Sequence, residues 1–114
     1  RYETIQLDDD TDIMIVAFGS AARIAEKAIE IAREQGIKAG LFRPITLWPF
    51  PEKEIAQAVH GKRGVLVVEI NAGQMIEDVR LAVNGEVTVE HFGRLGGIVP
   101  EPEEIVNAIK EKLL

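Results

Sequence analysis

The chain has 114 residues, of which 46% are apolar, contains no cysteine and carries a formal net charge of −6. These numbers exclude disulfides, thiolate catalysis and a cysteine-ligated iron–sulfur cluster within the chain, and they make nucleic acid and anionic membranes poor partners. There is no apolar run of about 18 residues and no signal-peptide pattern. The absence of cysteine fits a cytoplasmic protein, which is the localisation that we expect. We expect one domain over residues 1–114, and since the chain opens with Arg1 rather than methionine, we expect it to be a piece of a longer chain.

The first predicted element is the loosely alternating segment Tyr2–Leu7, which is typical of a strand whose direction the pattern leaves open. Asp8, Asp9 and Asp10 follow it. Successive carboxylates suggest a calcium site, but the complete Asp-x-Asp-x-Asp-Gly pattern and its downstream glutamate are absent. We therefore expect a solvated turn and no metal.

The segment from Asp12 to Gly36 predicts a strand, a tight turn and a helix around which the other elements pack. The unbroken apolar run Ile13–Phe18 favours a central strand that is covered on both faces. Gly19 allows a sharp turn, Ser20 is expected to cap the helix, and Gly36 is expected to end it. The predicted buried stripe of the helix consists of Ile24, Ala25, Ala28, Ile29, Ile31 and Ala32.

A second strand is predicted over Ile37–Phe42. It should end by Arg43, because Pro44 has no N–H to donate to a ladder. The proline-rich crossover that follows leads into a helix predicted from Pro51 to about His60.

Two further strand–helix units complete the chain. Val65–Ile70 is another apolar strand, and Val87–Phe92 alternates clearly, as a strand near a sheet edge does. A last helix is predicted to begin at Pro102. The inward residues are expected to be Met75, Ile76, Val79 and Val83 in the third helix, and Ile105, Val106, Ile109 and Leu113 in the last.

Apolar strands that alternate with amphipathic helices predict an α/β domain whose mostly parallel sheet has helices on both faces. Right-handed crossovers place Ile13–Phe18 between Ile37–Phe42 and Val65–Ile70. Ligands and partners of such sheets meet the carboxyl ends of the strands. A site is therefore expected at that edge.

Residues that follow the strand ends are the candidates for an interface or for anion binding. The turn at Gly19 and Ser20 either binds an anion through the free N–H groups of a helix or is a plain tight turn. For the polar groups after the third apolar strand two interpretations stay open: they bond one another and the loop backbone, or they face a partner. The candidates are Gly19, Ser20, Glu69, Asn71, Gly73, Gln74, Arg94, Gly96 and Gly97.

The two histidines fit structural roles better than catalytic ones. His60 precedes Gly61 at a predicted helix end, and His91 has no serine, cysteine or second histidine arranged with it. No nucleophile with a base and no carboxylate dyad is recognisable. We expect no catalytic, cofactor-binding or metal-ligating residue in this chain.

Four segments together resemble the C-terminal domain of the α subunit of 2-oxoacid:ferredoxin oxidoreductases: IVAFGSAARIAEKAI, LFRPITLWPFPEKEI, VLVVEINAGQMIEDVR and EHFGRLGGIVPEPEEI. The most specific parts are E-x-N-x-G-Q at Glu69–Gln74 and F-G-R-L-G-G at Phe92–Gly97. The resemblance implies a three-layer αβα fold like the transketolase C-terminal domain, with a five-stranded, mostly parallel sheet. Tyr2–Leu7 would be its one antiparallel strand, beside Ile37–Phe42.

The resemblance also implies a role within a larger enzyme. The whole complex would oxidatively decarboxylate a 2-oxoacid to acyl-CoA with thiamine diphosphate, Mg²⁺, iron–sulfur clusters and CoA, and would reduce ferredoxin. This chain lacks the family's Gly-Asp-Gly motif, so we expect a non-catalytic domain that packs on a preceding pyrimidine-binding domain and on other subunits. The open alternatives are a C-terminal domain of a transketolase or of a pyruvate dehydrogenase E1 β-type enzyme, and a free-standing anion-binding module.

Overall fold

The computed structural model describes residues 1–70, 75–93 and 98–114. Five strands form one sheet in the order β1-β3-β2-β4-β5, in which β1 is antiparallel to β3 and the other pairs are parallel. The predicted fold class and the predicted neighbours of the central strand are therefore confirmed. The strands are β1 (Tyr2–Ile5), β2 (Ile13–Ala17), β3 (Ala39–Pro44), β4 (Gly64–Glu69) and β5 (Thr88–Gly93), and the helices are α1 (Ser20–Glu34), α2 (Glu52–Ala58), α3 (Met75–Val83) and α4 (Pro102–Leu113).

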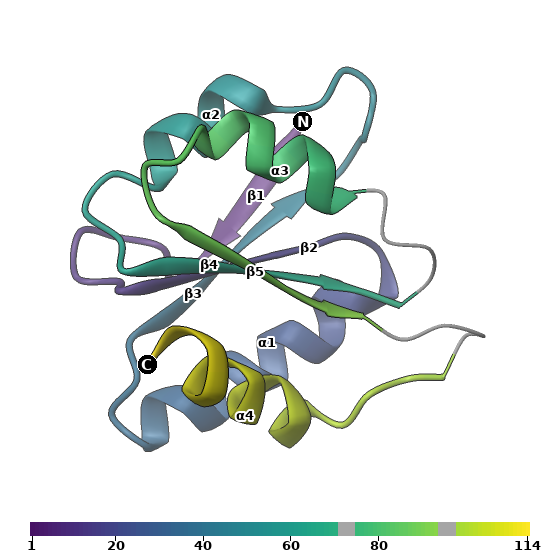
Figure 1. The fold of residues 1–114 in the computed structure, drawn as a ribbon. Coiled ribbons are helices and arrows are strands. Elements are labelled where there is room, and N and C mark those ends of the chain that lie inside the picture. Colours follow the sequence, from purple (N-terminus) through teal and green to yellow (C-terminus); the bar gives the residue numbers. More distant parts are fainter. Residues whose placement is uncertain (71–74, 94–97) are drawn as a thin grey trace.

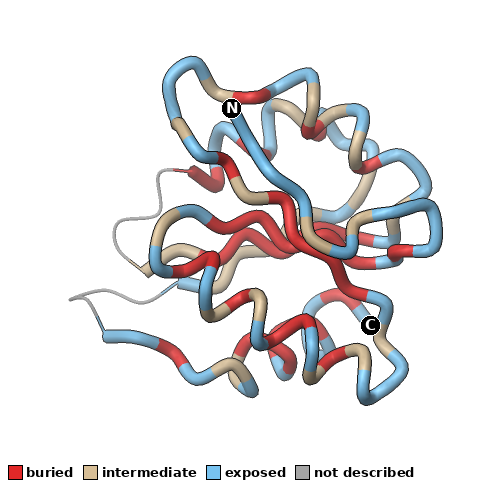
Figure 2. Tube along the Cα trace, turned by 180° about the vertical axis from the view of Figure 1, so that it is seen from behind, coloured by how far each residue is buried: buried red, intermediate tan, exposed pale blue. Residues whose placement is uncertain are grey.

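Helices α1 and α4 cover one face of the sheet, and α2 and α3 cover the other (Figure 1). Strand β2 lies in the middle, and all five of its residues are fully buried. Ile13 and Ile15 pack toward α1 and α4, whereas Met14 and Val16 pack toward α2 and α3. An apolar side chain at every position is what a parallel strand covered on both faces requires. Figure 2 shows the buried residues following the strands through the centre of the molecule.

The helices bury the faces that their periodicity predicts. In α1 the buried side chains are five alanines and Ile29, while Ile24 and Ile31 are only partly covered. The predicted inward residues of α3 and α4 are all buried. Gly36 ends α1 as expected: it has φ 81°, and the Ile37 N–H reaches back to the Ala32 carbonyl at 2.9 Å.

The predicted ends of the second and third strands are wrong. Strand β2 stops at Ala17, and the side chain of Phe18 is 41% exposed rather than part of a buried run. Strand β3 begins at Ala39 and extends through Pro44, beyond the predicted limit at Arg43. The proline is tolerated because it is the last residue of the strand, and the next bond to β1 comes from the Ile45 N–H, 2.9 Å from the Arg1 carbonyl oxygen.

The other elements differ from the predicted ranges by one or two residues at their ends. Strand β1 ends at Ile5 instead of Leu7, because Gln6 turns the chain with φ 53°. Strands β4 and β5 are each shifted by one residue from the predicted ranges, and α2 ends at Ala58, before His60. None of the helices in the described ranges combines the length and apolar content needed to cross a bilayer.

Candidate functional site

The carboxyl ends of the parallel strands lie at one edge of the sheet, where the candidate residues were expected. Glu69 ends β4 and pairs in register with Gly93, the last residue of β5. Gly19 and Ser20 follow β2, whose residue Ala17 pairs with Val68 of β4. The fold therefore brings Gly19, Ser20 and Glu69 to the same edge of the sheet. Asn71, Gly73, Gln74, Arg94, Gly96 and Gly97 lie outside the described residues.

The Glu69 carboxylate holds the start of α3. Its Oε1 accepts the Met75 N–H at 2.9 Å, and its Oε2 accepts the Ile76 N–H at 3.1 Å. These are N–H groups of the first helical turn, which have no partner inside the helix, and the negative charge also suits the positive end of the helix dipole. Glu69 is only 11% exposed, so these bonds take the place of hydrogen bonds to water that burial removes.

His91 completes this cluster from the neighbouring strand. Its Nε2 lies 3.2 Å from Glu69 Oε2, and its backbone carbonyl accepts the Lys112 Nζ at 2.7 Å. A Cβ at Gly93 would stand 2.6 Å from His91 Cε1, so a larger residue there would force the imidazole ring to move away from its present position. The predicted packing role of His91 is thus accompanied by an ion-pair geometry that sequence reasoning missed.

The turn at Gly19 and Ser20 is not capped in the predicted way. Gly19 occupies the N-cap position with φ 64° and ψ −135°, and no side chain caps the helix. Ser20 is already the first residue of α1, one position too late for its hydroxyl to cap the first turn. Sequence reasoning identified the sharp turn correctly but assigned the cap to the wrong residue.

This geometry predicts opposite outcomes for two adjacent substitutions. Gly19→Ala should destabilise the chain by about 1–3 kcal/mol, because an L-residue is strained at this φ and ψ even though the space around it is open. Ser20→Ala should change stability by less than about 0.5 kcal/mol, because no cap is lost. Urea unfolding followed by circular dichroism measures both. A Ser20→Ala loss equal to that of Gly19→Ala would contradict the assignment of the cap.

The acidic turn after β1 is held together by its own chain. The Asp8 carboxylate accepts the Asp10 N–H at 2.9 Å, and the Thr11 hydroxyl donates to the Gln6 carbonyl oxygen at 2.7 Å. Within the described ranges no group of three or more histidine, aspartate or glutamate side chains is arranged to hold a metal ion. The contacts of Asp8 and Thr11 agree with the predicted turn.

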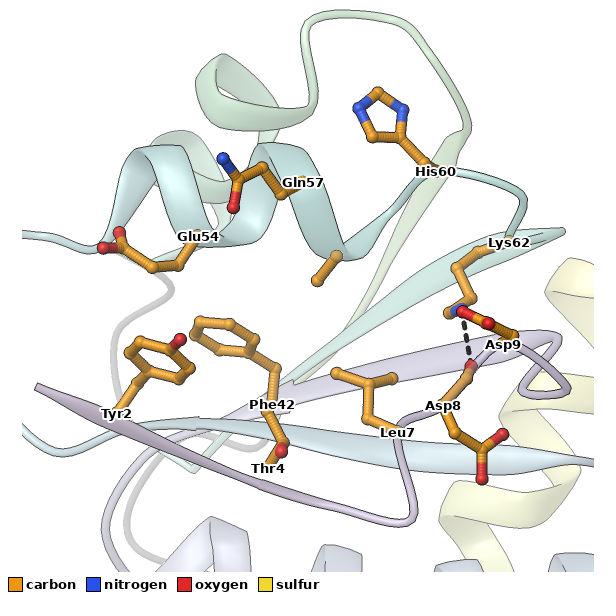
Figure 3. A pocket seen from close by; sticks show the side chains of 11 residues that line it. Tyr2, Thr4, Leu7, Asp8, Asp9, Phe42, Glu54, Gln57, His60 and Lys62 are labelled. Atoms are coloured by element: carbon orange, nitrogen blue, oxygen red, sulfur yellow. Dashed lines mark hydrogen bonds between the residues drawn. The ribbon is translucent and has the colours of Figure 1, made fainter.

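A groove of about 350 Å³ between β1 and α2 was not predicted (Figure 3). Its floor is formed by Tyr2 and Phe42, whose rings stack at 4.9 Å with an interplanar angle of 6°. At one end the Lys62 Nζ donates to the Asp8 carbonyl at 2.9 Å. The groove is left open because α2 has only seven residues and does not cover the outer strand β1. The apolar and polar pattern of the strands does not reveal how far a helix extends over them, so the groove could not be predicted.

Comparison with known proteins gives the family. The model of the pyruvate:ferredoxin oxidoreductase core domain II matches residues 11–105. The chain is 43% identical over 111 residues to the ketoisovalerate oxidoreductase subunit VorB of Methanothermobacter thermautotrophicus, a match that covers 97% of this chain and 31% of VorB. It is 41% identical over 101 residues to the 2-oxoglutarate synthase subunit KorA of Methanothermobacter marburgensis, covering 89% of this chain and 27% of KorA. The chain thus spans less than a third of the length of these two relatives.

Two solved structures share the fold. A 2-oxoglutarate:ferredoxin oxidoreductase from Magnetococcus marinus superposes with a TM-score of 0.80 and 23% identity, covering all of this chain and 20% of that one. A split-gene transketolase, an inactive β4 tetramer, superposes with a TM-score of 0.81 and 18% identity, covering 99% of this chain and 41% of that one. At such identities the likeness shows the fold alone. The family follows from the sequence matches: the chain belongs to the pyruvate:ferredoxin oxidoreductase core domain II family.

Proposed function

We propose that this chain is the C-terminal domain of the α subunit of a 2-oxoacid:ferredoxin oxidoreductase, and that it serves assembly rather than catalysis. The observation that carries the proposal is the family match over residues 11–105. The α subunit is inferred from the segments Glu69–Gln74 and Phe92–Gly97, which resemble that subunit most specifically. The relatives are named for 2-oxoglutarate and ketoisovalerate, which supports a 2-oxoacid as the substrate of the whole enzyme.

The geometry of the strand ends supports a non-catalytic role. Glu69 has both carboxylate oxygens engaged by its own chain, and His91 bonds to the same carboxylate. Groups that hold a helix and a strand in place are poorly suited to move protons on a substrate. In this proposal thiamine diphosphate, Mg²⁺, iron–sulfur clusters and CoA are bound by other parts of the enzyme, which also transfer electrons to ferredoxin.

The alternatives have less support. The likeness to the split-gene transketolase is one of fold at 18% identity, whereas the relatives above 40% identity are named as a ketoisovalerate oxidoreductase and a 2-oxoglutarate synthase subunit. A free-standing anion-binding module would rest on the Gly19–Ser20 turn alone, and a bare helix start is common in proteins.

A domain exchange tests the proposal. The test uses VorB of Methanothermobacter thermautotrophicus, of which this chain matches 31% of the length. That matching region of VorB is replaced by residues 1–114 of this chain. The resulting chimaera is expressed together with the partner subunits of that enzyme. We expect assembly and ketoisovalerate-dependent reduction of a low-potential dye. The 114-residue chain alone should show no thiamine diphosphate binding by calorimetry in the presence of Mg²⁺, and no turnover.

Two results would count against the proposal. Turnover of a 2-oxoacid, or thiamine diphosphate binding, by the isolated chain would show that it carries chemistry of its own. A chimaera that is folded by circular dichroism but remains unassembled and inactive would show that the chain is no assembly domain of such an enzyme.

A further inference from the structure

Large apolar side chains are exposed around the carboxyl end of β3. Five of them, here called the edge surface, come from the start of β1, the end of β2 and the crossover after β3: Tyr2, Phe18, Ile45, Leu47 and Trp48. Trp48 is 89% exposed. Exposing the apolar ring of a tryptophan to water is unfavourable, and several large apolar side chains exposed near one edge of a small domain suggest an interaction site.

The crossover presents these side chains outward because both of its ends are fixed. Pro44, at the end of β3, and Pro51, just before α2, are buried, and Phe50 packs against the core cluster beneath α2 and α3. Between these anchors Leu47 and Trp48 point away from the core. The exposure of Trp48 is therefore built into a loop whose two ends are held by the core.

The other two members lie at neighbouring strand ends. Tyr2 pairs in register with Pro44, and Phe18 follows β2, the strand on the other side of β3. Figure 1 shows the crossover and the turn between β2 and α1 on the same side of the molecule. The edge surface thus consists of residues at or just beyond the ends of three adjacent strands, β1, β3 and β2, on one side of the sheet.

The positions of the two chain ends indicate what covers this surface. The Arg1 carbonyl oxygen accepts the Ile45 N–H at 2.9 Å, so a polypeptide preceding Arg1 enters the domain at the edge surface. The C-terminal end lies at the opposite edge, where the Arg63 Nε donates to the Leu113 carbonyl oxygen at 3.0 Å, just before β4 begins. Relatives of which this chain spans 27% to 31% have ample additional polypeptide to cover the edge surface.

We propose that the edge surface, of which Trp48 is the most exposed member, is the docking face for the domain that precedes Arg1 in the longer subunit. This inference rests on the proposed function. Tryptophan is enriched among the few interface residues that dominate binding energy. The other apolar members of the edge surface would then help to exclude water from the interface.

The chimaera with VorB provides the test, because Trp48 is the only tryptophan among these 114 residues. Both the isolated chain and the chimaera are labelled with 5-fluorotryptophan, and the Trp48 resonance is identified by its loss in Trp48→Phe. We expect a clear ¹⁹F shift between H₂O and D₂O in the isolated chain, and a shift at least about fivefold smaller in the chimaera, where the ring is buried.

Two aspartate substitutions at exposed leucines make a matched pair. Leu47→Asp is expected to restore the solvent shift in the chimaera and to raise the rate of proteolysis at the domain junction at least about tenfold, because cleavage follows the population of the open form. Leu81→Asp places the same charge on an exposed position of α3, away from the edge surface, and should change neither. Circular dichroism of the isolated chains checks that both variants fold.

The outcomes separate the two proposals. An active chimaera in which Trp48 stays as solvent-exposed as in the isolated chain, or in which Leu47→Asp behaves like Leu81→Asp, overturns the docking face and leaves the proposed function standing. Self-association of the isolated chain that Leu47→Asp abolishes assigns the surface to a second copy and also overturns it. A folded chimaera that neither assembles nor turns over contradicts the proposed function, and the docking face falls with it.

Discussion

Gly40→Ala is expected to destabilise the chain by about 3 kcal/mol, the upper end of the usual cost of overpacking. A Cβ on Gly40 of β3 would clash with the Gln6 carbonyl oxygen, and it would stand 2.9 Å from the Gln6 carbonyl carbon and 3.0 Å from the Leu7 Cα. These are backbone atoms, so no side chain can rotate away. The Gln6 carbonyl is also held by the Thr11 hydroxyl at 2.7 Å and by the Arg33 Nη2 at 3.0 Å. Relief of the clash must therefore break bonds that fix the turn after β1.

Gly64→Ala is the matched control. Its Cβ would stand 2.7 Å from Leu113 Cδ2, the far end of a flexible side chain in the last turn of α4. Repacking of one leucine should limit the loss to about 1 kcal/mol. Urea unfolding of both variants, followed by circular dichroism, measures the difference in their free energies of unfolding. The comparison requires that this free energy depends on urea concentration with the same slope in both variants. Equal losses at Gly40 and Gly64 would show that the Gln6 backbone yields more easily than its bonds imply.

Loss of the Glu69 carboxylate is expected to have the second largest effect. Glu69→Ala should destabilise the chain by about 2–3 kcal/mol, because it leaves two N–H groups at the start of α3 without their acceptor and removes a bond to His91. Glu69→Gln should cost about 1–3 kcal/mol, because its amide NH₂ would face one of those backbone donors. The test is thermal and urea unfolding, with α3 monitored by amide hydrogen exchange at Met75 and Ile76.

Two further variants show whether the loss comes from these specific bonds. Glu30→Gln removes a carboxylate that is 67% exposed and paired only at 3.9 Å with Lys27, so it should change stability by less than about 0.5 kcal/mol. A double-mutant cycle with His91→Ala should give a coupling energy of at least about 0.5 kcal/mol between Glu69 and His91. Zero coupling, or a Glu69→Ala loss no larger than that of Glu30→Gln, would show that the carboxylate does not hold the helix.

The Glu69 substitutions also bear on the proposed function. If the cluster of Glu69 and His91 serves the fold, the VorB chimaera carrying Glu69→Gln should lose thermal stability but keep its ketoisovalerate turnover per assembled complex at temperatures where it stays folded. A catalytic role would instead lower turnover in complexes that remain assembled.

Much of the fold was predictable because burial patterns repeat along the chain. The all-apolar run that begins at Ile13 predicted a central strand, and the 3.6-residue spacing of Met75, Ile76, Val79 and Val83 predicted the inward face of α3. The direction of β1 was not predictable from its own pattern, since alternation is the same in parallel and antiparallel strands. It followed from the family resemblance, and the pairing of Tyr2 with Pro44 agrees with it.

The position of the candidate site was predictable from the sequence, but the contacts between its side chains were not. Strand–helix alternation was sufficient to bring Glu69 to the carboxyl edge of the sheet, because parallel strands end on one side. Its partners were not predictable: the His91 ring is 22 residues away along the chain and becomes a neighbour only through the register of β4 and β5. The predicted Ser20 cap was wrong for a different, local reason: the helix begins one residue earlier than the pattern suggested, so that Gly19 occupies the N-cap position.

By itself, the sequence determined the order of the elements, the face that each one buries and the family to which the chain belongs, because periodicity and motif spacing are local properties of the chain. Only the tertiary structure decided that the Gln6 backbone crosses Gly40, that Glu69 holds α3 together with His91, and that Trp48 is left in water beside the N-terminus. Those contacts depend on strand register and on how far a short helix such as α2 extends over the sheet. Both are set by the packing of segments that are distant in sequence, which no local pattern records.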